Sequence, residues 1–437
     1  MTVDHSFRPT GSTFSREDPL TLQHAYGNYV AHRINPLTPL ELYIHVPFCL
    51  RRCGYCDFNT YTATDLGHGA SRSQFAHMIE QEIHLLDDWQ EQHGIPRRPI
   101  STIFFGGGTP TLLPAEDLVH ILTCIRRTWG ILPHAEITTE ANPDTVNERS
   151  IETLANGGFT RISFGMQSAV PRILNILDRT HDQQNVIRGV RAAQENGLRT
   201  SIDLIYGTPT ETMEEWKQSL TAAVDLHTTH ISCYALTVAP HTKMGRIIRD
   251  HRIPPVNDDD EAEKYEFADQ FLTNHQFTWY EISNWSIHGE ESQHNLGYWK
   301  NVDWFGLGPG AHAHLTTTHI HDELHPRIWA DKLNAHLLPW VEPEYLTAEE
   351  NLEETILLGI RLREGLPLSQ IIPSLTSTQT NHLTHEIHQL EHDQLLTLTH
   401  QHLIPTLKGR LLNDLIINRL LESITPPKTT TPHNHVK

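Results

Sequence analysis

The stretch Cys49-Leu50-Arg51-Arg52-Cys53-Gly54-Tyr55-Cys56, which follows the strand-like run Leu42–Phe48, decides the prediction of the fold. Three of the five cysteines fall within these eight residues. Thiolates bind iron–sulfur clusters, and a four-iron cluster with a full set of protein ligands takes four cysteines. Cys124 is expected in the middle of a helix and Cys233 in the middle of a strand, so neither suits the fourth position. The sequence therefore predicts a cluster with one iron left open, much as a catalytic zinc ion leaves one position for a small molecule.

Two other interpretations of the cysteines stay open. A zinc site usually takes two separated pairs of Cys or His, and no second pair lies at a suitable distance in the sequence. The three cysteines could also share a turn by coincidence, although free cysteines are usually scattered and buried. The spacing favours a cluster over both.

The overall composition limits the classes of function. A chain of 437 residues predicts two or three domains. The formal net charge of −20 argues against nucleic acid as the main partner, because a phosphate backbone needs clustered Lys and Arg. No secretion signal precedes residue 39, and no stretch approaches the roughly 20 apolar residues of a membrane span. Together with the clustered thiols, these features predict a cytoplasmic protein without integral membrane contact.

Short apolar runs alternate with helical patterns between residues 40 and 240. This alternation predicts parallel βαβ units, and six units make an α/β fold with an incomplete (β/α)6 barrel of the TIM type. In such barrels the site lies at the carboxyl ends of the strands. The predicted strands are Leu42–Val46, Thr102–Phe105, Glu136–Glu140, Arg161–Phe164, Ser201–Tyr206 and His230–Leu236.

The remaining segments differ from this pattern. Residues 1–39 predict a flexible extension, and residues 426–437 a disordered tail. Residues 241–344 predict an extension of the barrel, in which Phe277–Trp285 forms one further strand. Residues 345–425 predict a small winged-helix-like α+β domain, with helices around a hairpin. Thr347 and Glu350 suit a capping box at its first helix.

Polar and glycine-rich residues end several predicted strands, among them Gly106–Pro110, Glu140, Gln167 and Asp203. Glycines let backbone groups approach a ligand closely, and an acid buried in a strand is costly without a partner. A glycine run alone can be a turn, and a single acid can belong to a structural ion pair. Their shared position at the strand ends favours a ligand site.

Six runs resemble the family of oxygen-independent coproporphyrinogen III oxidases and their heme-chaperone relatives, which are radical S-adenosylmethionine (SAM) proteins. The resemblance covers about residues 41 to 425. It implies that SAM occupies the open iron through its methionine amine and carboxylate, and that the reduced cluster cleaves the sulfonium to give a deoxyadenosyl radical. The six runs are His45–Cys49, Gly106–Thr111, Glu140–Pro143, Arg161–Ser168, Arg179–His181 and Asp203–Pro209.

The resemblance also implies the residues of the site. Cys49, Cys53 and Cys56 would ligate a 4Fe-4S cluster, and no catalytic residue is assigned. A stacking or hydrogen-bonding tyrosine, glycines and carboxylates suit the parts of SAM. The implied SAM contacts are Tyr43, Gly107, Gly108, Thr109, Glu140, Gln167, Arg179 and Asp203.

A second candidate site is the run His294-Asn295-Leu296-Gly297-Tyr298-Trp299, followed by Gly306–His312. Glycine-rich, aromatic and histidine-bearing backbone suits a flat tetrapyrrole, although aromatic residues at this density are more often core. His or Tyr can ligate heme iron. The run resembles the heme-binding motif of the chaperone branch. His294 is the preferred ligand and Tyr298 the second, with Asn295 and Trp299 beside them.

The residue two positions after Cys56 separates two functions. Oxidases of this family carry a further cysteine there, whereas this chain has Phe58. The resemblance therefore favours a heme chaperone, with an unidentified heme-acceptor protein and an electron donor as partners. A coproporphyrinogen III oxidase of porphyrin biosynthesis, which decarboxylates propionates, is the alternative, and an iron–sulfur scaffold without SAM chemistry ranks last. Whether the chain is an enzyme and whether it forms a homodimer stay open.

Overall fold

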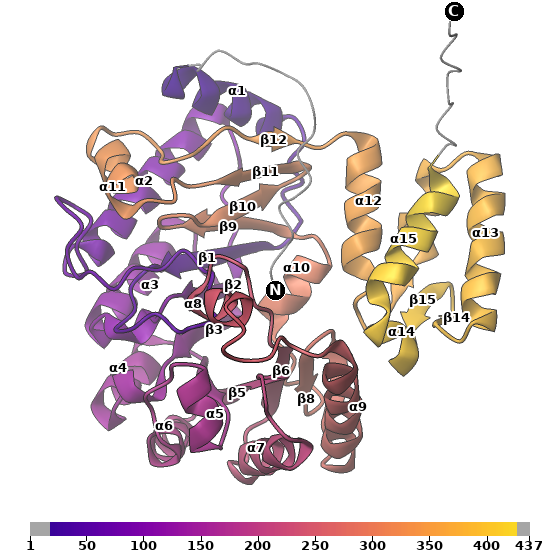
Figure 1. Cartoon of the computed structure of the whole chain (residues 1–437). Coiled ribbons are helices and arrows are strands. Elements are labelled where there is room, and N and C mark those ends of the chain that lie inside the picture. The colour runs from indigo at the N-terminus through magenta and orange to yellow at the C-terminus, as the bar shows by residue number, and fades with distance from the viewer. Residues whose placement is uncertain (1–17, 426–437) are drawn as a thin grey trace, which may run out of the picture. The chain divides into compact units, whose positions relative to one another are not determined.

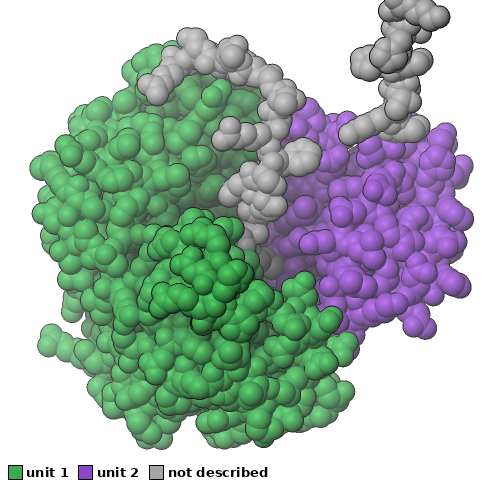
Figure 2. Space-filling view, viewed as in Figure 1, with its two compact units in different colours: residues 1–279, 283–297, 302–345 green, residues 280–282, 298–301, 346–437 purple. Residues whose placement is uncertain are grey.

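The computed structural model describes residues 18–425, which form two compact units (Figure 2). The first unit carries the cysteine loop and most of the chain. The second unit consists mainly of the C-terminal part of the chain. Among the described residues, 18–279, 283–297 and 302–345 belong to the first unit, and 280–282, 298–301 and 346–425 to the second.

A single open sheet of twelve strands organises the first unit. Its strand order is β12-β11-β10-β9-β1-β2-β3-β4-β5-β6-β8-β7, and β1 to β6 run parallel in chain order. The sheet does not close into a barrel, so the predicted α/β fold with an incomplete barrel is confirmed. The six parallel strands are β1 (Leu40–Val46), β2 (Ile100–Gly107), β3 (Ile131–Ala141), β4 (Arg161–Gln167), β5 (Arg199–Tyr206) and β6 (His230–Ala235).

The helices between these strands cover one face of the sheet (Figure 1). Side chains alternate between the two faces of a strand. On β1, Leu42, Ile44 and Val46 are fully buried, whereas Tyr43 and His45 belong to the opposite, polar face. The covering helices are α2 (Phe75–His93), α3 (Ala115–Thr128), α4 (Glu148–Gly157), α5 (Pro171–Ile176), α6 (Gln183–Glu195) and α7 (Met213–Asp225).

The strands beyond β6 differ from the prediction. Phe277–Trp285 forms two short strands, because a turn after residue 281 interrupts the run. β9 is a further parallel strand, paired with β1, and the sequence analysis did not predict it. The additional elements are β7 (Thr278–Glu281), β8 (Asn284–Ser286), β9 (Asp303–Leu307), β10 (His312–Leu315), β11 (Thr318–His321), β12 (Glu344–Tyr345), α8 (Lys243–Arg249), α9 (Asp258–Asn274), α10 (Gln293–Trp299) and α11 (Pro326–Asn334).

The prediction of a flexible extension over residues 1–39 is wrong for its described part, because α1 spans Pro19–Ala31. The Asp18 side chain accepts a hydrogen bond from the backbone N–H of Thr21 and caps the helix. Tyr26 is fully buried and stacks on Trp89, with ring centroids 5.5 Å apart. The helix is therefore part of the core of the first unit. Residues 1–17 and the predicted tail 426–437 lie outside the described residues.

The second unit contains three main helices and a small antiparallel sheet, as predicted for residues 345–425. The predicted capping box is present, since Glu350 accepts from the Thr347 N–H at 2.8 Å and Thr347 Oγ1 accepts from the Glu350 N–H at 3.2 Å. The elements are α12 (Ala348–Gly359), β13 (Leu366–Pro367), α13 (Ser377–His392), β14 (Leu396–Thr399), β15 (His402–Pro405), α14 (Leu407–Leu411) and α15 (Asn413–Ile424). Between residues 18 and 425, no helix is both long enough and apolar enough to cross a bilayer.

The packing of α1 generates the first prediction. Tyr26→Ala should lower the free energy of unfolding by about 3 to 5 kcal/mol, because it removes a fully buried aromatic ring from the core. Urea unfolding measures this difference. Leu37→Ala is the control, since Leu37 is 88% exposed and its loss should change stability by no more than about 0.5 kcal/mol. Equal stability of the Tyr26 variant and wild type would contradict the docking of α1.

Candidate functional site

The cysteine loop leaves β1 and returns to it. The Cys49 N–H donates to the Tyr61 carbonyl at 3.0 Å, and the Tyr61 N–H donates to the Pro47 carbonyl at 2.7 Å. Within the loop, the Cys56 N–H donates to the Cys53 carbonyl at 3.3 Å. All three cysteines are half-buried and form no disulfide. The loop is thus closed at its base and presents its thiols at the carboxyl end of β1.

The three thiols form one donor set. Burial, together with the nearby thiols of Cys56 and Cys53, raises the pKa of Cys49 to about 11. Arg179 Nη1 lies 3.6 Å from Cys53 Sγ, and its positive charge suits thiolates. The Thr109 hydroxyl lies 3.8 Å from Cys49 Sγ.

The glycine run after β2 lies against the start of this loop. The Gly108 N–H donates to the Val46 carbonyl at 2.8 Å, and the Thr109 N–H donates to the Phe48 carbonyl at 2.8 Å. A Cβ at Gly108 would approach the Phe48 carbonyl oxygen to 2.6 Å, and Gly107 has a φ of +106°. Both positions therefore require glycine for backbone reasons, whether or not a ligand is present.

Two carboxylates lie on the polar face behind the glycines. Glu140 Oε2 accepts from the Gly107 N–H at 3.2 Å, and Asp203 accepts from the hydroxyls of Ser163 at 2.9 Å and Ser232 at 2.8 Å. Burial, together with the charge of Asp203, raises the pKa of Glu140 to about 8. Burial also raises the pKa of Asp203. The pair can hold a proton or accept hydrogen bonds from hydroxyl or amine groups.

His45 is a residue of the site that the sequence analysis did not assign. Its Nε2 lies 2.9 Å from the Asn59 carbonyl, which can only accept, so Nε2 carries the proton. Its Nδ1 therefore accepts from the Tyr43 hydroxyl at 3.0 Å. The alternation of side chains along β1 could have indicated His45, because it places His45 on the same face as Tyr43.

Gln167 and Arg179, near the cysteine loop, each have a buried polar atom without a hydrogen-bond partner within the described residues. Gln167 ends β4 with a φ of +62°, a conformation that is uncommon for residues other than glycine and is often found at functional sites. Its Oε1 and Arg179 Nε are buried and have no hydrogen-bond partner within the described residues. A buried polar atom without a partner costs about 1 to 3 kcal/mol, so a polar ligand would satisfy both. Arg179 is held by its Nη2, which donates to the Gly165 carbonyl at 2.8 Å.

The structure thus brings the predicted cluster and SAM residues together at the carboxyl ends of the strands, but it does not bring His294 to them. His294 Nδ1 lies 2.7 Å from the Thr102 hydroxyl and 3.5 Å from Glu41 Oε2, near the amino ends of β2 and β1. Glu41 and His45 are four residues apart on one strand, which corresponds to about 13 Å. His294 is 1% exposed and stacks on Phe104.

The rest of the predicted heme segment is divided between the two units. Asn295 and Gly297 belong to the first unit, whereas Tyr298 and Trp299 belong to the second. A Cβ at Gly297 would collide with the carboxylate of Glu41, which explains why glycine is required there. In the second unit, the Arg361 guanidinium lies 5.5 Å from the centroid of a Trp299 ring.

Glu140 generates a prediction about pH. Because its folded pKa of about 8 exceeds the ordinary value of 4.5, the folded state retains a proton that the unfolded chain releases. The resulting stabilisation is complete below the unfolded pKa and is lost as the pH rises through the folded pKa. Glu140→Gln stays neutral, so between about pH 5 and pH 8.5 it should lose less free energy of unfolding than wild type.

Urea unfolding at both pH values measures this difference. The control is Glu152→Gln, because Glu152 is exposed on α4 and its variant should keep the wild-type pH dependence. If Glu140→Gln also kept the wild-type pH dependence, the raised pKa of Glu140 would be wrong.

Comparisons with known proteins identify the family and the fold of the chain. The family model of the radical SAM superfamily matches residues 43–223, and the model of the HemN C-terminal domain matches residues 346–412. The solved structure of Escherichia coli coproporphyrinogen III oxidase (HemN), described as a radical SAM enzyme, has a TM-score of 0.76 at 21% identity. The match covers 92% of this chain and 93% of that chain, and it shows a common fold.

Curated relatives named heme chaperone HemW match most of the chain. The protein of Mycobacterium tuberculosis strain H37Rv is 38% identical, over 88% of this chain and 96% of its own. The Escherichia coli K12 protein is 35% identical, over 77% and 86%, and the Bacillus subtilis 168 protein is 33% identical, over 74% and 84%. The resemblance inferred from the motifs is therefore confirmed, and the chain belongs to the HemW family of the radical SAM superfamily.

Proposed function

We propose that this protein binds heme and transfers it to an acceptor protein, with a 4Fe-4S cluster and SAM as its resident cofactors. The observation that carries the proposal is the 38% identity, over 88% of the chain, to relatives named heme chaperone HemW. The cluster and SAM are what membership of the radical SAM superfamily implies.

The cysteine loop is the proposed holder of the cluster. Cys49, Cys53 and Cys56 would each ligate one iron, and SAM would occupy the fourth. When bound and reduced, such a cluster supplies the electron that cleaves the sulfonium of SAM. Arg179, 3.6 Å from Cys53 Sγ, would offset the negative charge of the thiolates.

The SAM contacts proposed from the resemblance fit the polar groups near the loop. Gln167 Oε1 and Arg179 Nε are buried without a partner among the described residues, and a polar ligand would offer one. Glu140 and Asp203 would accept from the hydroxyl and amine groups of SAM. The backbone of three neighbouring residues, Gly107, Gly108 and Thr109, allows a ligand to approach closely. The hydroxyl of Tyr43 lies on the same face and completes the proposed contacts.

Phe58 supports the chaperone over the oxidase. It stands where oxidases of the resembling family carry a further cysteine, and its side chain is 52% exposed rather than part of the core. Because a thiol is absent at this position, no fourth cysteine of the loop is available. The likeness to HemN extends to the fold, at an identity of 21%, and does not carry the oxidase activity over.

The heme segment is proposed to be α10 and its surroundings, with His294 as the ligand and Tyr298 as the second choice. Since His294 is 1% exposed and lies 2.7 Å from the Thr102 hydroxyl, heme ligation by its imidazole requires α10 to move away from β2. Asn295 and Trp299 complete the proposed segment.

The proposed setting is the cytoplasm, with an electron donor and the heme acceptor as protein partners. The proposed assembly is a monomer or a homodimer.

One experiment tests the chaperone proposal against the oxidase. The protein is reconstituted with iron and sulfide under anaerobic conditions, supplied with SAM, and divided into two samples. Heme titration followed by visible absorption should saturate at a defined stoichiometry in the first sample. Conversion of coproporphyrinogen III in the second should stay at the background level. Turnover at ordinary enzymatic rates, of about 1 per second or more, without heme binding would reject the proposal.

A second experiment tests His294. His294→Ala should weaken heme binding by at least tenfold and leave the cluster absorbance unchanged, because the imidazole is distant from the cysteine loop. The matched control is Thr102→Val, which removes the hydroxyl near His294 Nδ1 but keeps the imidazole. This control should bind heme at least as tightly as wild type, because α10 is released more easily. Equal heme affinity in His294→Ala and wild type would remove His294 as the ligand.

A further inference from the structure

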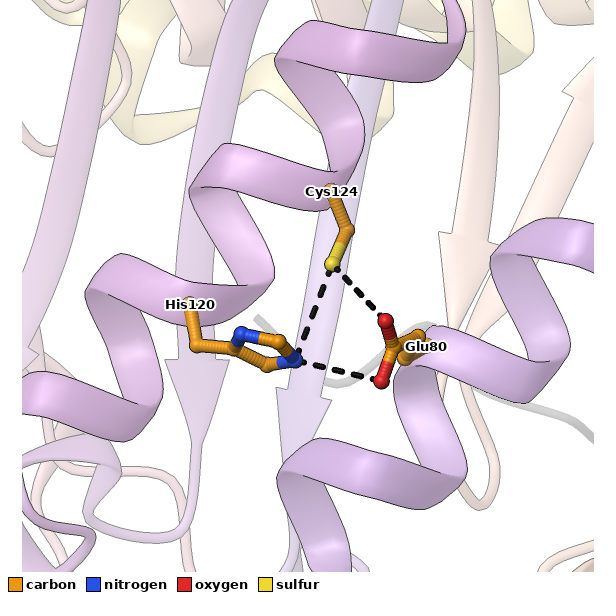
Figure 3. Close-up of side chains that lie close together, drawn as sticks. All are labelled: Glu80, His120 and Cys124. Atoms are coloured by element: carbon orange, nitrogen blue, oxygen red, sulfur yellow. Dashed lines mark hydrogen bonds and ion pairs between the residues drawn. The ribbon is translucent and has the colours of Figure 1, made fainter.

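Glu80, His120 and Cys124 form a cluster on the helices that cover the sheet, outside the proposed cofactor site (Figure 3). Glu80 belongs to α2, and His120 and Cys124 belong to α3. His120 and Cys124 are four residues apart, so they share one face of the helix. All three side chains point toward one another in Figure 3. The cluster combines an imidazole, a thiol and a carboxylate, which are the three side-chain types that ligate zinc.

The distances within the cluster match the edges of a tetrahedral metal site. With the usual zinc–sulfur, zinc–nitrogen and zinc–oxygen distances, the thiol should lie about 3.6 Å from each other ligand, and the imidazole nitrogen about 3.4 Å from the oxygen. Cys124 Sγ lies 3.6 Å from Glu80 Oε1 and 3.7 Å from His120 Nε2. His120 Nε2 lies 3.2 Å from Glu80 Oε2. One ion between the three side chains would therefore need only a small rotation of the carboxylate.

We propose that Glu80, His120 and Cys124 bind one zinc ion, with water in the fourth position. The ion replaces the hydrogen bond of the thiol to Glu80, and the thiol proton leaves to solvent as the zinc–thiolate bond forms. Cys124 is 5% exposed, whereas the His120 side chain is 48% exposed, so the ion reaches its ligands from the solvent side. This site is independent of the proposed heme function.

His77 lies one turn before Glu80 on α2, with its Nδ1 3.7 Å from Glu80 Oε2. This distance is longer than a hydrogen bond, so His77 is not expected to ligate the ion or to hold the carboxylate.

The site would join two helices that lie next to each other in the fold. α2 connects β1 to β2, and α3 connects β2 to β3. A zinc ion bound from both helices adds a link between them that the folded state has and the unfolded chain lacks. Zinc should therefore raise the thermal midpoint of unfolding by an amount that grows with the free zinc concentration.

Equilibrium dialysis against buffered zinc, followed by elemental analysis of zinc and iron in the same sample, tests the proposal. The cluster is first reconstituted anaerobically, so that iron occupies the thiols of the cysteine loop. Wild type should bind one zinc ion per chain. His120→Ala and Cys124→Ser should weaken this binding by at least about 100-fold without a loss of iron, and His77→Ala should leave it nearly unchanged.

His84→Ala is the matched control, because His84 is an exposed histidine of α2 outside the cluster. It should bind zinc as wild type does. If Cys124→Ser fails to fold, as judged by circular dichroism, His120→Ala decides, since its side chain is half exposed. Equal zinc affinity in His120→Ala and wild type, or weak binding reduced equally by every histidine variant, would overturn the proposal.

Discussion

The fold of the first unit depends on burying a sheet that has one apolar face and one polar face. The apolar face is covered by helices, but the polar face must satisfy charged side chains in a low-dielectric interior. Near the amino ends of the strands, Arg161 and Glu136 form an ion pair at 3.3 Å with each side chain 1% exposed, and Glu136 also lies 3.3 Å from the backbone N–H of His294. Near the carboxyl ends, Gln167 Oε1 and Arg179 Nε are buried without partners among the described residues. Arg179 Nη1 lies 3.6 Å from Cys53 Sγ, so a polar ligand beside the cysteine loop would satisfy these atoms.

Much of this arrangement could be predicted from the sequence, because local patterns determine it. The spacing of Cys49, Cys53 and Cys56 and the apolar runs of β1 to β6 are readable without tertiary information. The helix α1 could not be predicted in this way, since its burial depends on Trp89, which lies far along the chain. β9 was missed for a related reason. Its pairing with β1 is a contact between distant segments, and Gly306 within it and Gly308 and Gly310 after it resemble a loop.

The segment from His294 to Trp299 has structural requirements beside the role proposed for it. Its histidine and glycine have structural reasons in the first unit, because Thr102 lies within hydrogen-bonding distance of His294 and Glu41 leaves no room for a side chain at position 297. The sequence pattern alone does not reveal whether an imidazole points to solvent or into a core. The side chain of His45 illustrates the reverse case, since it lies in the site although no pattern other than strand alternation indicates it.

The buried carboxyl groups of the polar face also alter how the folded molecule behaves in an electric field. Burial raises the pKa of Glu41 to about 9 and that of Glu140 to about 8. Both groups are therefore mostly protonated at pH 7, and the native chain is less negative than its formal charge of −20. Unfolding releases these protons, so the unfolded chain carries more negative charge at pH 7 than the native protein. The electric force that drives it toward the anode should therefore be larger, and it should bind anion-exchange resin more tightly than the native protein.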